Sequence, residues 1–68
     1  MSVKNNLKDI RHDYRMNQTE FADLLGLNVN QYNKYEHNRK QPNLETALMI
    51  SGKLNKTVNE LFERVPDN

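Results

Sequence analysis

Apolar residues recur along this chain at helical spacing, and no alternating apolar–polar run of strand length is present. A first helix, over about residues 4–15, is predicted by an i, i+3, i+7 stripe of Leu7, Ile10 and Tyr14. A second, shorter helix is predicted by an i, i+3, i+4 stripe of Phe21, Leu24 and Leu25. Asn17 can cap this second helix, with Glu20 as the return partner of a capping box. Gly26 follows the last apolar residue and can take the left-handed conformation that ends a helix.

The pattern continues after this glycine with a third helix and a polar loop. Asn28 can cap the third helix, on which Tyr32 and Tyr35 lie three residues apart on one inward face. Residues 37–42 contain no apolar side chain and end in proline, which predicts a loop. Asn38 is the residue type best able, after glycine, to take a positive φ at the end of the third helix.

Two further helices complete the predicted fold. A fourth helix opens after Pro42-Asn43, with an inner stripe of Leu44, Ala47, Leu48, Ser51 and Leu54 and with Ile50 beside it. Thr57 and Glu60 have the spacing of a capping box, which starts a short fifth helix carrying Val58, Leu61 and Phe62. The predicted fold class is therefore all-α, a compact five-helix single domain over residues 1–68.

Composition narrows the class of protein without changing this fold. A chain of 68 residues allows one domain, and a domain of this size gains stability from dimerisation. The apolar fraction is low, at 35%, but the net charge of +1 argues against a disordered chain. The absence of cysteine excludes disulfide scaffolds, thiolate zinc sites and thiol nucleophiles. The opening residues have no apolar run, so we expect no signal peptide or membrane span and a cytoplasmic location.

The small net charge conceals a basic, amide-rich middle. Residues 28–42 carry three basic side chains against one acidic side chain, which gives this segment a charge of +2. Asn or Gln fills seven of the sixteen positions from 28 to 43. Two of these amides are expected to cap helices, which leaves five for the surface.

Residues 18–36 have the spacing of a helix-turn-helix: a helix of about eight residues, a three-residue turn centred on Gly26, and a second helix of about eight residues. The short turn forces a steep crossing, so one face of the second helix packs inward and the other projects. The projecting face consists of Val29, Asn30, Gln31, Asn33 and Lys34. Amides can pair with the adenine edge, lysine can donate to guanine, and valine can contact a thymine methyl group. This face predicts binding in the DNA major groove.

This helix-turn-helix region and its flanks resemble a known family. The run QTEFADLLGLNVNQYNKYEHNRKQP, residues 18–42, is similar to the Cro and phage-repressor (lambda-repressor-like, Xre) family of helix-turn-helix proteins. The resemblance continues through the fourth and fifth helices and covers about residues 6–62. It implies a lambda-repressor-like fold and a DNA-binding transcriptional regulator.

The resemblance also implies roles for individual residues. The positions that reach base edges are Val29, Asn30 and Lys34, with Asn33 beside them. The positions near DNA phosphates are Gln18, Asn28, Arg39 and Lys40, and Gln18 also braces a base-reading side chain. A structural ion pair joins Arg11 to Glu36. Three positions depart from the family pattern. This chain has Asn38 where the family commonly has glycine, Tyr32 where an aliphatic residue is usual, and Val29 where a polar residue is often found.

We expect a homodimeric repressor that reads a palindromic operator through the third helix. The predicted dimerisation segment is residues 57–68, with an interface of Val58, Leu61, Phe62 and Val65, and no separate C-terminal oligomerisation domain is expected. Two alternatives remain: an antitoxin or anti-repressor component whose main partner is another protein, and a purely protein-binding helical module. The sequence has no catalytic constellation, glycine-rich phosphate loop or metal cluster, so we expect no enzyme, no cofactor, no metal and no small-molecule ligand.

Overall fold

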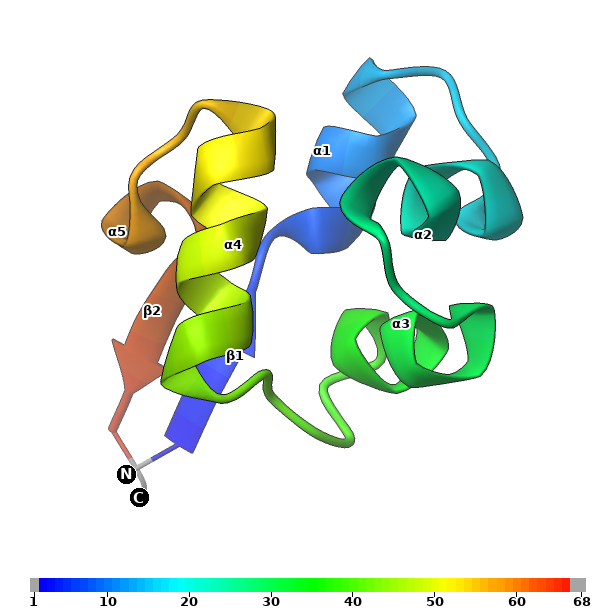
Figure 1. Cartoon of the computed structure of the whole chain (residues 1–68). Helices are drawn as coiled ribbons and strands as arrows, with labels where there is room; N and C mark the ends of the chain where they lie inside the picture. The colour runs from blue at the N-terminus through cyan, green and yellow to red at the C-terminus, as the bar shows by residue number, and fades with distance from the viewer. Residues whose placement is uncertain (1, 67–68) are drawn as a thin grey trace.

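The computed structural model describes residues 2–66, which form five helices and a two-stranded sheet. The elements are β1 (Ser2–Asn5), α1 (Leu7–Asp13), α2 (Gln18–Leu25), α3 (Val29–Glu36), α4 (Leu44–Leu54), α5 (Val58–Leu61) and β2 (Phe62–Val65). In Figure 1, α4 stands between a group formed by α1, α2 and α3 and a group formed by α5 and the sheet. Residues 1, 67 and 68, at the ends of the predicted domain and of the predicted dimerisation segment, lie outside the described residues. No helix between residues 2 and 66 has the length and apolarity needed to cross a bilayer.

The predicted caps of α2, α3 and α5 are confirmed. Asn17 and Glu20 form a complete capping box at the start of α2, and Thr57 and Glu60 form one at the start of α5. Gly26 ends α2 in the left-handed conformation, at φ 74°. The predicted cap at Asn28 and the predicted positive φ at Asn38 are also present, and Asn43 caps α4. Each of these features depends on groups only a few residues apart, which is why the local sequence predicts them.

The core lies where α1, α2, α3 and α4 meet. The ring of Phe21 contacts Tyr14 and Tyr32 edge to face, with centroids 5.5 and 5.6 Å apart. The hydroxyl of Tyr32, fully buried, lies 3.5 Å from the backbone oxygen of Leu7. The apolar residues of this core are Leu7, Ile10, Phe21, Ala22, Leu25, Tyr32, Tyr35, Ile50, Leu54 and Leu61.

The prediction of a strictly all-α fold is wrong, because the two ends of the chain form an antiparallel sheet. Ser2 pairs with Val65 and Asn5 with Phe62, and the ammonium group of Lys4 lies 3.0 Å from the carboxylate of Glu63. Residues 4 and 5, predicted as the start of the first helix, therefore belong to β1. Neither strand shows a period-2 pattern, and the partners lie about sixty positions apart, so local periodicity could not reveal them.

The predicted inner stripe of α4 also needs correction. The buried residues are Ala47, Ile50 and Leu54, whereas Leu44 is 71% exposed and Leu48 is 55% exposed. Apolar side chains surround more than half of this helix, so the sequence allows two overlapping stripes. The packing of α4 against the rest of the domain selects the stripe that includes Ile50.

The predicted dimer interface is wrong at Leu61. This side chain has no exposed surface and belongs to the core, so it cannot contact a second copy of the folded chain. Phe62 begins β2 and packs partly against the core, and Val58 and Val65 are half-buried. The segment after Thr57 was predicted as excess apolar surface, but Leu61 and Phe62 pack in or against this domain's own core.

Candidate nucleic-acid interface

A tight turn joins α2 to α3 and sets their crossing. The backbone N–H of Leu27 donates to the carbonyl oxygen of Ala22 at 2.8 Å, which closes the turn around Gly26. The side chain of Asn28 then accepts from the backbone N–H groups of Asn30 and Gln31 and starts α3. Figure 1 shows α3 at the edge of the molecule, below α2 in this view. The geometry is that of a helix-turn-helix whose second helix is accessible from outside.

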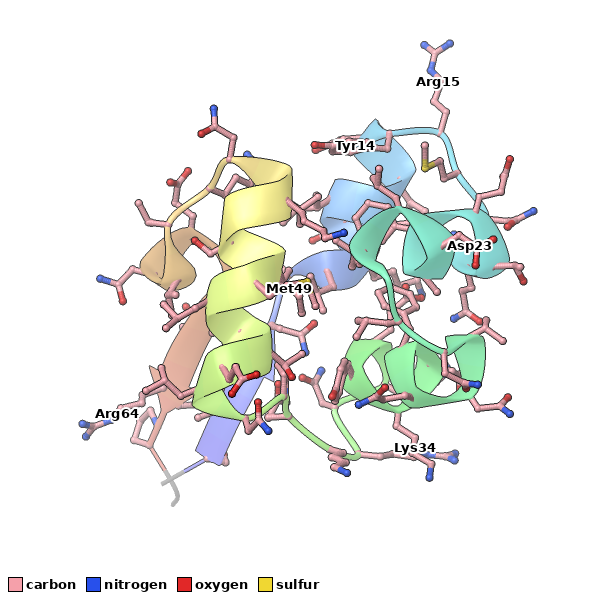
Figure 2. All side chains as sticks on the ribbon, viewed as in Figure 1. Tyr14, Arg15, Asp23, Lys34, Met49 and Arg64 are labelled. Carbon is pink, nitrogen blue, oxygen red and sulfur yellow. The ribbon has the colours of Figure 1, made fainter. Side chains whose placement is uncertain are left out.

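The two faces of α3 differ in chemistry. Tyr32, Tyr35 and Glu36 are buried against the domain, while Asn30 and Lys34 are exposed. Figure 2 shows Lys34 pointing away from the rest of the domain, at the opposite end of the molecule from Arg15. Within residues 2–66 the side chain of Asn30 has no hydrogen-bond partner. These two side chains are therefore available to a ligand that approaches α3 from outside.

The other two predicted base-reading residues are partly engaged by the domain. Val29 is half-buried and packs against the core. Asn33 is half-buried, and its Nδ2 donates to Oε1 of Gln18 at 3.1 Å. The structure therefore joins Asn33 of α3 to Gln18 at the start of α2.

Gln18 in turn connects to a buried ion pair. Nε and Nη2 of Arg11 donate to the two carboxylate oxygens of Glu36 at 2.9 and 3.0 Å, in a bidentate arrangement. Nε2 of Gln18 donates to the same carboxylate at 3.0 Å. Only 1% of the Glu36 side chain and 13% of the Arg11 side chain is exposed. We call this set the charged network: Arg11, Gln18, Asn33 and Glu36.

The environment of Glu36 keeps its carboxylate ionised. Burial by itself would raise its pKa, but Arg11, Tyr32 and Gln18 together lower the pKa of Glu36 to about 2. The pKa of Arg11 is raised, chiefly by its hydrogen bond to Glu36. Both groups therefore carry full charge at neutral pH and neutralise each other inside the domain.

A basic loop follows α3. Arg39 and Lys40 are exposed, and their backbone N–H groups donate to the carbonyl oxygen of Lys34 at 3.0 and 3.4 Å. The loop turns at Asn38, which has a φ of 57°. In Figure 1 the loop connects the end of α3 to the start of α4 along the lower edge of the molecule, the edge where Figure 2 places Lys34. Three cationic side chains thus emerge from α3 and the segment directly after it.

Three amides attach this loop to β1, and we call Asn5, Asn38 and Gln41 the amide cluster. Nδ2 of Asn5 donates to Oε1 of Gln41 at 3.0 Å, and the backbone N–H of Asn5 donates to Oδ1 of Asn38 at 3.2 Å. Nε2 of Gln41 donates to Oδ1 of Asn38 at 2.9 Å. Sequence reasoning missed Asn5 and Gln41, because nothing in the local pattern places the first five residues beside residue 41.

The amide excess of the middle segment is therefore mostly structural. Gln31 donates to the hydroxyl of Tyr35 at 2.7 Å, and Asn43 caps α4. Asn28 caps α3, Asn33 belongs to the charged network, and Asn38 and Gln41 belong to the amide cluster. Of the seven amides of residues 28–43, only Asn30 has a side chain that makes no hydrogen bond within residues 2–66. The five amides expected at the surface are not buried, but all of the seven except Asn30 also hold parts of the fold together.

Comparison with known proteins agrees with this geometry. A family model described as helix-turn-helix matches residues 7–61, from the start of α1 to the end of α5. The chain belongs to the Cro and phage-repressor type of helix-turn-helix family, a family of DNA-binding transcriptional regulators. The resemblance noted in the sequence is thereby confirmed.

A curated relative gives a more specific comparison. The cryptic phage CTXphi transcriptional repressor RstR of Vibrio cholerae serotype O1 (strain ATCC 39315 / El Tor Inaba N16961) is 30% identical over 64 residues. The matched region is 94% of this chain and 57% of that relative, so the chain spans little more than half of the relative's length.

Proposed function

We propose that this protein is a sequence-specific, double-stranded DNA-binding repressor that acts as a homodimer on a palindromic operator. One observation carries the proposal: α3 is held by its buried tyrosines and Glu36, while its outer face presents Asn30 and Lys34 beside a basic loop. A helix fixed on one side and polar on the other is the form that a major-groove reading element requires.

The base-reading face would consist of Asn30, Lys34 and the exposed part of Val29. The amide of Asn30 can pair with an adenine edge, and Lys34 can donate to guanine O6 or N7. Asn33 lies beside them and is held by Gln18, so these two side chains would meet DNA as a pair. Because the pair is bonded to Glu36, it is already oriented before DNA arrives.

Phosphate contacts would come from residues around this face. Arg39 and Lys40 are exposed basic side chains on the loop that follows α3. Asn28 caps α3 and Gln18 is the first residue of α2, and helix starts are places where backbone N–H groups and amide side chains commonly meet phosphates. Such contacts fix the position of α3 on the duplex without reading its sequence.

A single α3 helix contacts too few base pairs to specify an operator, whereas a dimer would contact two half-sites. Half-sites read by such a dimer lie about one turn of DNA, roughly 34 Å, apart, and the principal extents of the chain, 35 × 21 × 21 Å, are of the same order. The most exposed large apolar side chains of the described chain are Leu44 and Leu48, four residues apart on α4. We propose this stripe of α4, in place of the segment after Thr57, as the contact between the two copies.

The role as a repressor is supported by the relative, whose name is that of a phage transcriptional repressor. A dimer bound over a promoter would block access to it by occupancy, with no chemistry required. The comparison does not extend to the unmatched part of that relative.

The proposal is tested by selecting binding sites from randomised duplexes with the purified protein and measuring affinity at several salt concentrations. We expect an inverted repeat, two protomers per duplex and a log–log salt slope set by the phosphates contacted. Leu44→Glu with Leu48→Glu should abolish cooperative binding of the second copy and lower the stoichiometry to one protomer per duplex at protein concentrations at which the unmodified protein fills both half-sites. Selection of no sequence at low salt would refute DNA binding, and a monomer that binds only with a different protein would refute the homodimer.

Variants separate base reading from phosphate binding. Asn30→Ala and Lys34→Ala should each lose about 1–3 kcal/mol of discrimination at one base pair, whereas Arg39→Ala should weaken all sequences alike. Asn59→Ala and Lys8→Ala are matched controls, because these residues are exposed on α5 and α1. A uniform loss for Asn30→Ala and Lys34→Ala would contradict direct readout.

A further inference from the structure

The basic loop is held at both ends by the amide cluster. Asn38 comes directly before Arg39, and Gln41 comes directly after Lys40. Both flanking side chains bond to β1: Oδ1 of Asn38 accepts from the backbone N–H of Asn5, and Nε2 of Gln41 donates to the carbonyl oxygen of Val3 at 3.0 Å. The position of the two cations therefore depends on β1 as well as on α3.

Asn5 is the centre of this arrangement. Its Nδ2 donates to the carbonyl oxygen of Tyr35, at 2.8 Å, as well as to Gln41, and its Oδ1 accepts from the backbone N–H of Leu7 at 3.1 Å. Tyr35 lies in the last turn of α3, and Leu7 is the first residue of α1. One side chain thus joins β1, α1, α3 and the loop.

The strand that carries Asn5 is itself fixed. β1 pairs along its length with β2, with Asn5 opposite Phe62 and with Lys4 paired to Glu63 at 3.0 Å. Phe62 packs against the core, so the sheet cannot shift without disturbing the domain. The loop is therefore attached to a sheet formed by the two ends of the described chain.

Holding the loop in place has a consequence for binding. A loop that is ordered before it meets DNA does not lose that conformational freedom on binding, and its cations reach phosphates at a smaller entropic cost. We propose that Asn5 is a positioning residue for DNA binding, which acts through the amide cluster to hold Arg39 and Lys40 in their phosphate-contacting conformation. This inference rests on the proposed function.

The test compares Asn5→Ala and Gln41→Met with Asn6→Ala on the selected duplex. Asn6 is a matched control, because it is the same residue type one position later and its Nδ2 donates to the carbonyl oxygen of Glu60 in α5, away from the loop. We expect Asn5→Ala and Gln41→Met to weaken binding about 3- to 10-fold on all sequences alike and to make the salt slope shallower. Asn6→Ala should bind as the unmodified protein does.

A double-mutant cycle separates positioning from general destabilisation. In a protein that already carries Arg39→Ala and Lys40→Ala, Asn5→Ala should weaken binding less than about 2-fold, because the side chains that it positions are gone. In parallel, amide hydrogen exchange at Arg39 and Lys40, whose N–H groups bond to Lys34, should accelerate in Asn5→Ala and not in Asn6→Ala. Gln41→Met keeps the test decisive if Asn5→Ala fails to fold.

Three outcomes would overturn the proposal. Binding and salt slopes of Asn5→Ala and Gln41→Met equal to those of the unmodified protein would show that the cluster does not position the loop. An undiminished loss in the background lacking both cations would show that the cluster acts elsewhere. Failure of the unmodified protein to bind any duplex would instead remove the proposed function, and with it this inference, before any variant is compared.

Discussion

Two polar networks hold α3, and they differ in charge and in burial. The charged network is attached to its inner side and contains the ion pair of Arg11 and Glu36, with the Glu36 side chain 1% exposed. The amide cluster is attached to its C-terminal end and is neutral, with Asn38 on the surface and Asn5 and Gln41 half-buried. Both networks join segments that lie far apart in the sequence.

Because of this difference, we expect the two networks to have different roles. A buried carboxylate is tolerated only while its partners neutralise it, since an uncompensated charge inside a domain is costly. A neutral amide at the surface can exchange its protein partners for water at little net cost. The charged network should therefore determine whether the domain folds, and the amide cluster should determine where the basic loop lies.

The largest effect is expected from breaking the charged network. Glu36→Ala leaves Arg11 as an unpaired charge and should lower the free energy of unfolding by about 3–5 kcal/mol. Urea denaturation followed by circular dichroism measures this change. Glu45→Ala is a control, because Glu45 is exposed on α4, and it should stay within about 0.5 kcal/mol. A loss below about 1 kcal/mol for Glu36→Ala would remove the distinction between the networks.

A somewhat smaller effect is expected from protonating the same carboxylate. The folded pKa of Glu36 is about 2, below its ordinary value of 4.5, so its contribution is fully present above pH 4.5 and is lost as the pH falls toward 2. The loss should amount to about 3 kcal/mol at most. Urea denaturation at a series of pH values measures it as the difference between the unmodified protein and Glu36→Gln, which cannot ionise. Parallel pH profiles for the two proteins would contradict the assignment.

The smallest effect is expected from the amide cluster. Asn38→Gly removes the acceptor of two hydrogen bonds but relieves the strain of a φ of 57°, so the free energy of unfolding should change by less than about 1 kcal/mol. Asn38→Ala loses the same bonds and keeps the strained backbone, so it should be less stable than Asn38→Gly by roughly 1 kcal/mol. Thermal and urea denaturation of the two variants check this order. A loss for Asn38→Gly as large as that for Glu36→Ala would show that the cluster also supports the fold.

Much of the fold could be predicted because its signals are local. The capping boxes at Asn17 and Thr57 and the left-handed Gly26 join groups a few residues apart, and the structure contains all of them. The burial of Tyr32 and Tyr35 followed from their spacing on a helix whose other face is polar. The left-handed turns at Arg15 and Asn55 were not predicted, although these residues directly follow Tyr14 and Leu54, the last residues of two predicted apolar stripes.

The candidate site was predictable only in part. Family resemblance implied that Arg11 and Glu36 pair and that Gln18 braces a neighbour, and the structure contains both contacts, with Asn33 as that neighbour. The sequence predicted a positive φ at Asn38 and placed Gln41 in a polar loop, but it did not predict that Asn5 bonds to both. Residue types alone do not tell whether an amide binds a ligand or another part of its own chain.

The sequence by itself determined the caps that start α2, α3 and α5 and the glycine that ends α2, and it showed that a helix-turn-helix with an exposed polar face lies in the middle of the chain. Only the tertiary structure decided that the two ends pair as a sheet, that Ile50 and Leu61 belong to the core, and that Leu44 and Leu48 remain outside it. The reason is range: caps and turns depend on neighbours along the chain, whereas strand pairing and the choice of a buried face depend on surfaces that meet only after folding. The amides of residues 28–43 illustrate this difference. Their concentration in this segment was visible in the sequence, but the partners of Asn38 and Gln41 were decided by contacts with Asn5, more than thirty residues away.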